Sequence, residues 1–234
     1  MRILITGGAG FVGSHLADKL IGEGHQITVI DDLSTGKYSN VEHLEGKENF
    51  RLIIDTVLNE KLLEELVRDA DHVYHMASAV GVRLIMEQPV KTIETIFHGT
   101  DAILKFCSRY RKRVLIPSTS EVYGKGASVP FKEDDDLLTG ATDKHRWAYA
   151  CAKTLDEFLA LAHWKLLDAP KCLGQVINLG NDEEVTITQL AERAISLTGS
   201  RSEIRYIPYS QAYGEGFEDM RRRVPSLEKA KDLI

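Results

Sequence analysis

The chain has 234 residues, of which 43% are hydrophobic and 27% charged, and its formal net charge is −6. This composition excludes a disordered chain, and the negative charge argues against nucleic acid or an acidic membrane surface as the main partner. No stretch is long and apolar enough to span a membrane, and Met1 leads directly into an apolar run without a signal sequence. Three cysteines, Cys107, Cys151 and Cys172, show no metal-ligand spacing. We therefore expect a soluble, cytoplasmic protein without a metal site.

Short apolar runs alternate with helical patterns through the first half of the chain. Such alternation predicts an α/β fold in which a parallel sheet is covered by helices on both faces. Right-handed crossovers between the strands then give a doubly wound topology. The predicted strands are 3–6, 27–30, 52–54, 72–76 and 114–116, and the predicted helices are 11–23, 58–68 and about 90–109.

The second half begins with a loop rich in Gly, Asp and Thr at 124–144. We expect 1–170 to form one domain and 171–234 to form a small, truncated α/β region. Thr186 or Thr188 can cap a helix in this second region. The predicted elements of this half are helices at 149–166 and 188–197 and from 227, and strands at 175–179 and 204–207.

Three glycines follow the first predicted strand with the spacing GxxGxxG. Gly7, Gly10 and Gly13 stand between a strand and a helix, where backbone N–H groups at the helix N-terminus can bind a pyrophosphate. Asp31 ends the second strand, and a carboxylate there accepts hydrogen bonds from ribose hydroxyls and repels a 2′-phosphate. The motif therefore predicts a dinucleotide site that prefers NAD to NADP.

Tyr149 and Lys153 stand four residues apart in a predicted helix, so they share one helix face. At a separation of roughly 6 Å, the ammonium would stabilise a tyrosinate by about 3 kcal/mol. We therefore expect Lys153 to lower the pKa of Tyr149 by about two units, toward the range of a general base. Hydroxyls and a carboxylate at Ser118, Thr119 and Glu121 follow the fifth strand, at the edge where such sheets bind ligands.

Together these motifs resemble the extended short-chain dehydrogenase/reductase family, in its NAD-dependent epimerase/dehydratase branch. The resemblance implies a Rossmann fold that binds NAD. The residues that carry it are TGGAGFVGSHL at 6–16, DDLSTG at 31–36, Asp55, HMAS at 75–78, STSEVYG at 118–124 and YACAK at 149–153. The cofactor-binding residues that it implies are Gly7, Gly10, Phe11, Val12, Gly13, Asp31, Asp32, Ser34, Thr35, Gly36, Asp55, Met76, Ala77, Ser78, Tyr149 and Lys153.

The resemblance also implies a reaction on a nucleotide-sugar, with a UDP-sugar expected. Tyr149 takes the proton of the C4 hydroxyl while the sugar is oxidised to a 4-ketone, and Lys153 holds the nicotinamide ribose. Thr119 and Ser120 assist, and Glu121 can serve a second proton transfer. The substrate-binding residues implied are Val82, Ser118, Thr119 and Arg223.

The fate of the 4-keto sugar is left open among three reactions. The loop at 79–84 favours a 4-epimerase, which is the expected activity. The STSEVYG form and the stretches at 40–43 and 223–226 resemble UDP-glucuronate decarboxylases, and Glu121 also suits a dehydratase. Helices 90–109 and 149–166 pack across a two-fold axis in relatives, which implies a homodimer.

The chain departs from the family pattern in two places. Ile96 stands where the family usually has an asparagine that braces the active site. After Trp164, most of the segment that grips the nucleotide and sugar is missing, so the edge of the sheet is expected to be filled by 175–179 or to stand open. This gap leaves an alternative of another class, a non-catalytic NAD-binding module.

Overall fold

The computed structural model describes residues 1–164, 174–181, 183–213, 217–220 and 222–233. Its centre is a five-stranded parallel sheet in the order β3-β2-β1-β4-β5. The chain moves outward from β1 to β3 and then returns to the other side of β1, which is the doubly wound order that the sequence predicts. The strands are β1 (Arg2–Thr6), β2 (Gln26–Asp31), β3 (Phe50–Ile54), β4 (His72–His75) and β5 (Arg113–Leu115).

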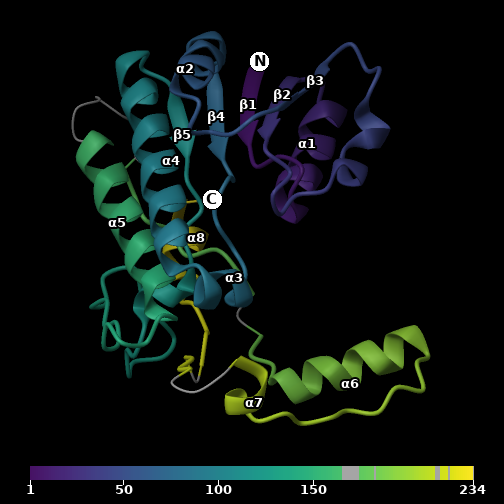
Figure 1. Ribbon diagram of the computed structural model, residues 1–234, viewed down its shortest axis with the longest axis vertical. Coiled ribbons are helices and arrows are strands. Elements are labelled where there is room, and N and C mark those ends of the chain that lie inside the picture. Colours follow the sequence, from purple (N-terminus) through teal and green to yellow (C-terminus); the bar gives the residue numbers. More distant parts are fainter. Residues whose placement is uncertain (165–173, 182, 214–216, 221, 234) are drawn as a thin grey trace.

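Alternate side chains of β1 enter two separate cores, one on each face of the sheet. Leu4 packs with apolar residues of the helices α2 and α4, whereas Ile3 and Ile5 pack with α1. A further helix, α5, lies alongside α4, away from the sheet (Figure 1). The helices are α1 (Phe11–Gly22), α2 (Glu60–Asp69), α4 (Pro89–Arg109) and α5 (Trp147–Trp164).

The predicted strands and helices of the first 164 residues are confirmed, with ends that differ by at most two residues where the structure describes them. The sequence did not predict the short helix α3 (Val82–Glu87), since only a loop was expected there. Three 3-10 turns are also present, η1 (Tyr38–Asn40), η2 (Glu42–Leu44) and η3 (Ser120–Tyr123).

The strand predicted at 175–179 is wrong. This stretch makes side-chain contacts instead of pairing with β5: Asn178 receives a hydrogen bond from Tyr123 Oη at 2.9 Å and donates from Nδ2 to Phe131 O at 3.0 Å. Among the described residues no sixth strand pairs with β5, so the sheet ends there. Within the part of the chain that the structure describes, the second alternative drawn from the sequence, an open edge, is the one observed.

The C-terminal part contains helices but no strand among its described residues. The strand predicted at 204–207 is also wrong, because this exposed stretch has no neighbouring strand to pair with. The predicted helix at 188–197 is confirmed as α6, with a capping box between Thr186 and Gln189. In Figure 1, α6 and α7 lie apart from the sheet, and no residue of α6 is buried. The helices are α6 (Ile187–Thr198), α7 (Tyr209–Tyr213) and α8 (Glu228–Leu233).

Candidate dinucleotide and catalytic site

The glycine loop between β1 and α1 packs backbone against backbone. Gly7 has a φ of +67°, and its N–H donates to Ile30 O at 2.8 Å. A Cβ on Gly7 would lie 2.5 Å from the Ala77 nitrogen, and a Cβ on Gly13 would lie 2.4 Å from the Gly7 oxygen. Gly10, the N-cap of α1, has no side chain to occupy the N–H groups of the first turn. The loop therefore fits a phosphate group at a helix N-terminus.

The contact at Gly13 gives a direct prediction. Gly13→Ala pushes α1 away from the loop, so we expect the free energy of unfolding to fall by about 1–3 kcal/mol and NAD affinity to fall at least about tenfold. Urea denaturation and calorimetry measure the two effects. Gly22→Ala is the matched control, because a Cβ on Gly22 meets nothing within 4 Å at the other end of the same helix. Equal behaviour of the two variants would contradict the role of the loop.

Asp31, at the end of β2, connects two loops through its carboxylate. Oδ2 accepts the N–H of Ala9 and Oδ1 accepts that of Leu33, both at 2.8 Å. The loop folds closely over this carboxylate, since a Cβ on Gly36 would lie 3.0 Å from Asp31 Oδ1. The structure therefore places Asp31 beside the glycine loop, as the sequence predicts.

The other residues predicted to bind the cofactor follow the carboxyl ends of the parallel strands or begin α1. Phe11 and Val12 expose 78% and 63% of their surface although both are apolar. Oδ1 of Asp55, after β3, accepts the Thr56 N–H at 2.7 Å. Ser78, after β4, has a buried hydroxyl with no hydrogen-bond partner. The remaining members at this edge are Asp32, Ser34, Thr35, Met76 and Ala77.

His75 is buried between β1 and α4 at this edge. Its Nδ1 lies 2.8 Å from Thr6 Oγ1 and its Nε2 lies 3.3 Å from Thr100 Oγ1. Burial, together with the charge of Lys153, lowers the pKa of His75 to about 3. The imidazole is therefore neutral at physiological pH.

This shift predicts a pH dependence of stability. Between the folded value of about 3 and the unfolded value of about 6.5, the unfolded chain binds the proton and the folded chain does not. Stability therefore falls as the pH drops below about 6.5, by about 2 kcal/mol at pH 5. Urea titrations at both pH values measure the loss. His75→Asn should reduce this slope and replacement of the exposed His145 should not; equal slopes in all three proteins would contradict the assignment.

The catalytic tyrosine predicted from the sequence lies beside Thr119, with which its hydroxyl forms a hydrogen bond. The expected lowering of its pKa by Lys153 is wrong for this structure. Burial and then the charge of Glu121 raise the pKa of Tyr149, while the bond with Thr119 and the charge of Arg146 lower it. Lys153 Nζ instead donates to Asp156 Oδ2 at 2.8 Å, so a carboxylate offsets its charge.

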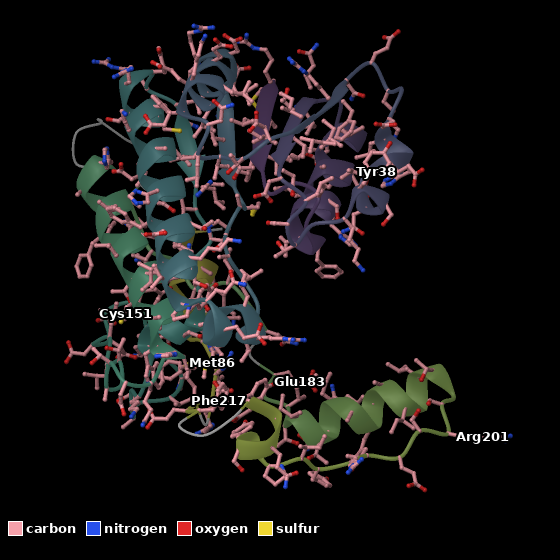
Figure 2. All side chains as sticks on the ribbon, viewed as in Figure 1. Tyr38, Met86, Cys151, Glu183, Arg201 and Phe217 are labelled. Carbon is pink, nitrogen blue, oxygen red and sulfur yellow. The ribbon has the colours of Figure 1, made fainter. Side chains whose placement is uncertain are left out.

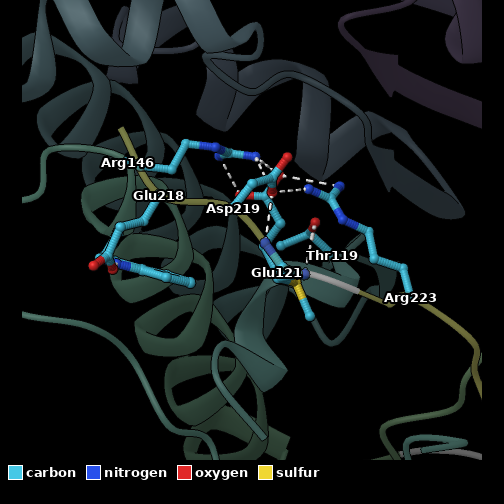
Figure 3. Close-up of polar contacts among 8 residues, drawn as sticks. Thr119, Glu121, Arg146, Glu218, Asp219 and Arg223 are labelled. Carbon is cyan, nitrogen blue, oxygen red and sulfur yellow. Dashed lines mark hydrogen bonds and ion pairs between the residues drawn. The ribbon is translucent and has the colours of Figure 1, made fainter. Parts of the chain in front are cut away.

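Glu121 lies in a cluster of two arginines and a second carboxylate (Figure 3). Both its carboxylate oxygens accept hydrogen bonds from Arg146, whose side chain is 4% exposed. Arg223 Nη1 lies 3.6 Å from Glu121 Oε1, and the other terminal nitrogen of Arg223 pairs with Asp219. The Glu121 N–H donates to Thr119 Oγ1 at 3.3 Å. The structure therefore brings together Glu121 and Arg223, which are 102 positions apart in the sequence.

The other predicted residues have more peripheral positions. Ser118 is exposed and its hydroxyl donates to Glu157 on α5, while Ser120 is half-buried at the start of η3. Val82 is half-buried at the start of α3. Sequence reasoning did not select Arg146 or Asp156. The available signals were an arginine three residues before Tyr149 and an aspartate one helical turn after Lys153.

The described residues contain no group of His, Cys, Asp and Glu that could hold a metal ion. Within the described helices, none has the length and apolarity needed to cross a lipid bilayer. Cys107 is a buried free thiol, and burial raises its pKa to about 12. Cys151 is an exposed free thiol on α5 (Figure 2), and Cys172 lies outside the described residues.

Comparison with known proteins assigns the chain to a family. The family model described as GDP-mannose 4,6 dehydratase matches residues 4–206. A UDP-N-acetyl-alpha-D-glucosaminuronate decarboxylase from Bacillus cytotoxicus is 35% identical over 99% of this chain and 91% of its own length. The chain belongs to the NAD-dependent epimerase/dehydratase branch of the extended short-chain dehydrogenase/reductase family. NAD is the cofactor of this family, so the cofactor and fold predicted from the sequence are confirmed.

Two further relatives illustrate the extent of the similarity. UDP-glucuronic acid decarboxylase 1 of Xenopus tropicalis is 47% identical and is matched over 100% of this chain and 67% of its own length. The solved structure of DesIV, a dTDP-glucose 4,6-dehydratase from Streptomyces venezuelae with NAD and TYD bound, has a TM-score of 0.64 at 27% identity. That match covers 70% of this chain and 52% of DesIV, so this chain corresponds to about half of that enzyme.

The alignments also bear on the missing segment. The match with the Bacillus cytotoxicus enzyme extends over 295 positions, whereas this chain has 234 residues. At least 61 positions (295 − 234) of that alignment therefore have no counterpart here. This agrees with the shortening recognised in the sequence.

Proposed function

We propose that this family member is an NAD-dependent decarboxylase of a UDP-linked uronic acid. Among its relatives, one is a UDP-N-acetyl-alpha-D-glucosaminuronate decarboxylase and five are UDP-glucuronic acid decarboxylases. The proposal replaces the 4-epimerase expected from the sequence with the decarboxylase held as its alternative. It is supported most directly by Arg223 beside Glu121, whose N–H donates to Thr119 Oγ1.

A uronic acid carries a carboxylate on the sugar, which an uncharged hexose lacks. Arginine is well suited to bind it, because its guanidinium presents several donors in one plane. Arg146 is buried and pairs with Glu121 through both terminal nitrogens, whereas the side chain of Arg223 is 38% exposed. We therefore assign Arg223 to the substrate carboxylate and Arg146 to holding Glu121.

The residues predicted to hold NAD fit this role. The backbone cradle of Gly7, Gly10 and Gly13 suits the pyrophosphate, Asp31 suits the adenosine ribose, and the unpartnered hydroxyl of Ser78 is available at the same edge. When bound, NAD supplies a hydride acceptor for C4 of the sugar.

Side chains around η3 carry out the proton transfer. Tyr149 Oη takes the proton of the C4 hydroxyl, and Thr119 orients that phenol through the hydrogen bond between them. Glu121, whose two oxygens accept from Arg146, is suited to orient Arg223. The second proton transfer expected of Glu121 stays a prediction.

The test is product analysis after incubation with UDP-glucuronate, UDP-N-acetylglucosaminuronate and UDP-glucose. Mass spectrometry should show loss of CO2 from a uronate and no change in UDP-glucose. Arg223→Gln should raise the KM for the uronate, whereas Arg222→Gln, which breaks an exposed pair with Glu184, should not. An unchanged mass with altered stereochemistry would favour the epimerase. NAD binding without any conversion would favour the non-catalytic module.

The remaining predictions concern assembly and location. The proposed homodimer would join α4 and α5 to those of a second copy, and both helices expose apolar side chains, among them Val90, Ile93 and Phe158. The cytoplasmic location and the division into domains at 170 stay predictions.

A further inference from the structure

Buried polar side chains extend from Lys153 to the strand that leads into the glycine loop. Lys153 Nζ donates to Asp156 Oδ2 at 2.8 Å, and these residues are 4% and 1% exposed. Burial raises the pKa of Asp156, which the charge of Lys153 and the Thr100 hydroxyl lower in part. This hydroxyl, on α4, lies 3.3 Å from His75 Nε2. His75 Nδ1 lies 2.8 Å from Thr6 Oγ1. These side chains thus lie on four neighbouring elements, α5, α4, β4 and β1.

The donors and acceptors of these side chains are consistent with one set of hydrogen-bond directions. An ammonium only donates and a carboxylate only accepts, so any hydrogen bond between Thr100 and Asp156 is donated by the Thr100 hydroxyl. Thr100 Oγ1 then accepts from His75 Nε2, which leaves His75 Nδ1 to accept from the Thr6 hydroxyl. Thr6 Oγ1 in turn accepts the Ala77 N–H at 3.1 Å. The neutral state of His75 supplies the single N–H that this arrangement requires.

The surroundings of Lys153 leave Asp156 as its charge partner. The facing part of α4 presents Ile96, a buried apolar side chain that packs near Tyr149. Among the described residues, the other titratable groups near Lys153 are His75, which is neutral, and Tyr149 and Glu157 on its own helix; the Glu157 carboxylate accepts from Ser118. Oδ1 of Asp156 is buried without a hydrogen-bond partner, so burying this carboxylate costs folding free energy.

We propose that Asp156 is the positioning residue for Lys153, and that Thr100, His75 and Thr6 fix this pair relative to the glycine loop. The inference rests on the proposed NAD site, because the lysine directed by Asp156 would meet the cofactor there. Asp156 is thereby added to the Tyr–Lys pair as a residue that affects cofactor binding through Lys153.

Cofactor binding tests this role without turnover. In Asp156→Ala the buried ammonium loses its charge partner, so the affinity for NADH should fall about tenfold to a hundredfold. It should also weaken further as the pH rises from about 6 to about 9, because burial favours the neutral amine. Asp156→Asn keeps an acceptor oxygen, so it should bind nearly as wild type at the lower pH and follow the alanine variant at the higher.

The matched control is Thr154→Val, on the same helix, which removes a buried hydroxyl that has no partner and keeps the side-chain shape. This variant should bind NADH as wild type at every pH. Unchanged affinity and pH dependence in Asp156→Ala would overturn the inference, and thermal melts of each variant exclude loss of fold as the cause of weak binding.

A cofactor-free measurement separates this inference from the proposed function. With 13C at lysine Cε, the Lys153 resonance is identified from its loss in Lys153→Arg. It should move with pH between about 6 and about 9 more strongly in Asp156→Ala than in wild type. Equal behaviour would overturn the positioning role even if NAD binds. If the Lys153 resonance depends on pH as expected in Asp156→Ala but the wild-type protein decarboxylates no uronate, only the proposed function is overturned.

Discussion

Replacing Tyr149 with phenylalanine should lower the rate of C4 oxidation by about 10²–10⁴-fold, because it removes the phenol that accepts the substrate proton. NADH affinity should change little, since the aromatic ring that packs against Ala79, Ile96 and Ala152 remains. Single-turnover formation of NADH from enzyme loaded with NAD and a UDP-uronate, followed by absorbance, measures the rate.

The pH dependence of that rate provides a second measurement. Burial and the charge of Glu121 raise the pKa of Tyr149. Because the deprotonated phenol is the base, the rate should rise with pH through the alkaline range. Glu121→Gln removes one of the two main causes of the raised pKa, so the rising limb should move to lower pH. A rate that is independent of pH from neutral upward would contradict Tyr149 as the base.

The control for Tyr149→Phe is Tyr110→Phe, which removes a phenol of the same kind outside the site. Tyr110, at the C-cap of α4, donates from Oη to Glu64 Oε1 on α2 at 2.8 Å. The Tyr110→Phe variant should oxidise C4 at the wild-type rate. Retention of more than about a tenth of the rate in Tyr149→Phe would remove this tyrosine from the mechanism.

Arg146→Ala should cost about 3–5 kcal/mol of unfolding free energy, because it leaves the buried Glu121 carboxylate without its bidentate partner. The remaining cation, Arg223, lies 3.6 Å from Glu121 and is partly exposed, so it compensates only in part. Urea denaturation measures the loss. A double variant, Arg146→Met with Glu121→Gln, should recover part of it, since no buried charge then remains unpaired.

Arg222→Ala is the matched control for Arg146→Ala. Arg222 pairs with Glu184 through two hydrogen bonds of 2.7 and 2.6 Å, which resemble the Arg146 pair in geometry. Both partners are about half exposed, so the expected loss is below about 1 kcal/mol. Similar losses in the two variants would mean that burial does not determine the strength of the Arg146 pair.

Local sequence patterns predicted the fold and the cofactor loop because their physical causes are local. The spacing of Gly7, Gly10 and Gly13 reflects contacts within the loop and with the strands beside it. The position of Asp31 follows from the length of one βα unit. Tyr149 and Lys153 share a helix face because of helical periodicity. None of these features depends on the part of the family fold that this chain lacks.

The sequence by itself determined the doubly wound sheet, the glycine cradle and the Tyr–Lys pair. Only the tertiary structure decided the electrostatics of the site. It paired Lys153 with Asp156 and placed Arg146 and Arg223 around Glu121. Burial and the charge of Glu121 raise the pKa of Tyr149, where the sequence predicted a decrease. The physical reason is that a charge interaction depends on burial and on every nearby charge, including those that are distant in the sequence.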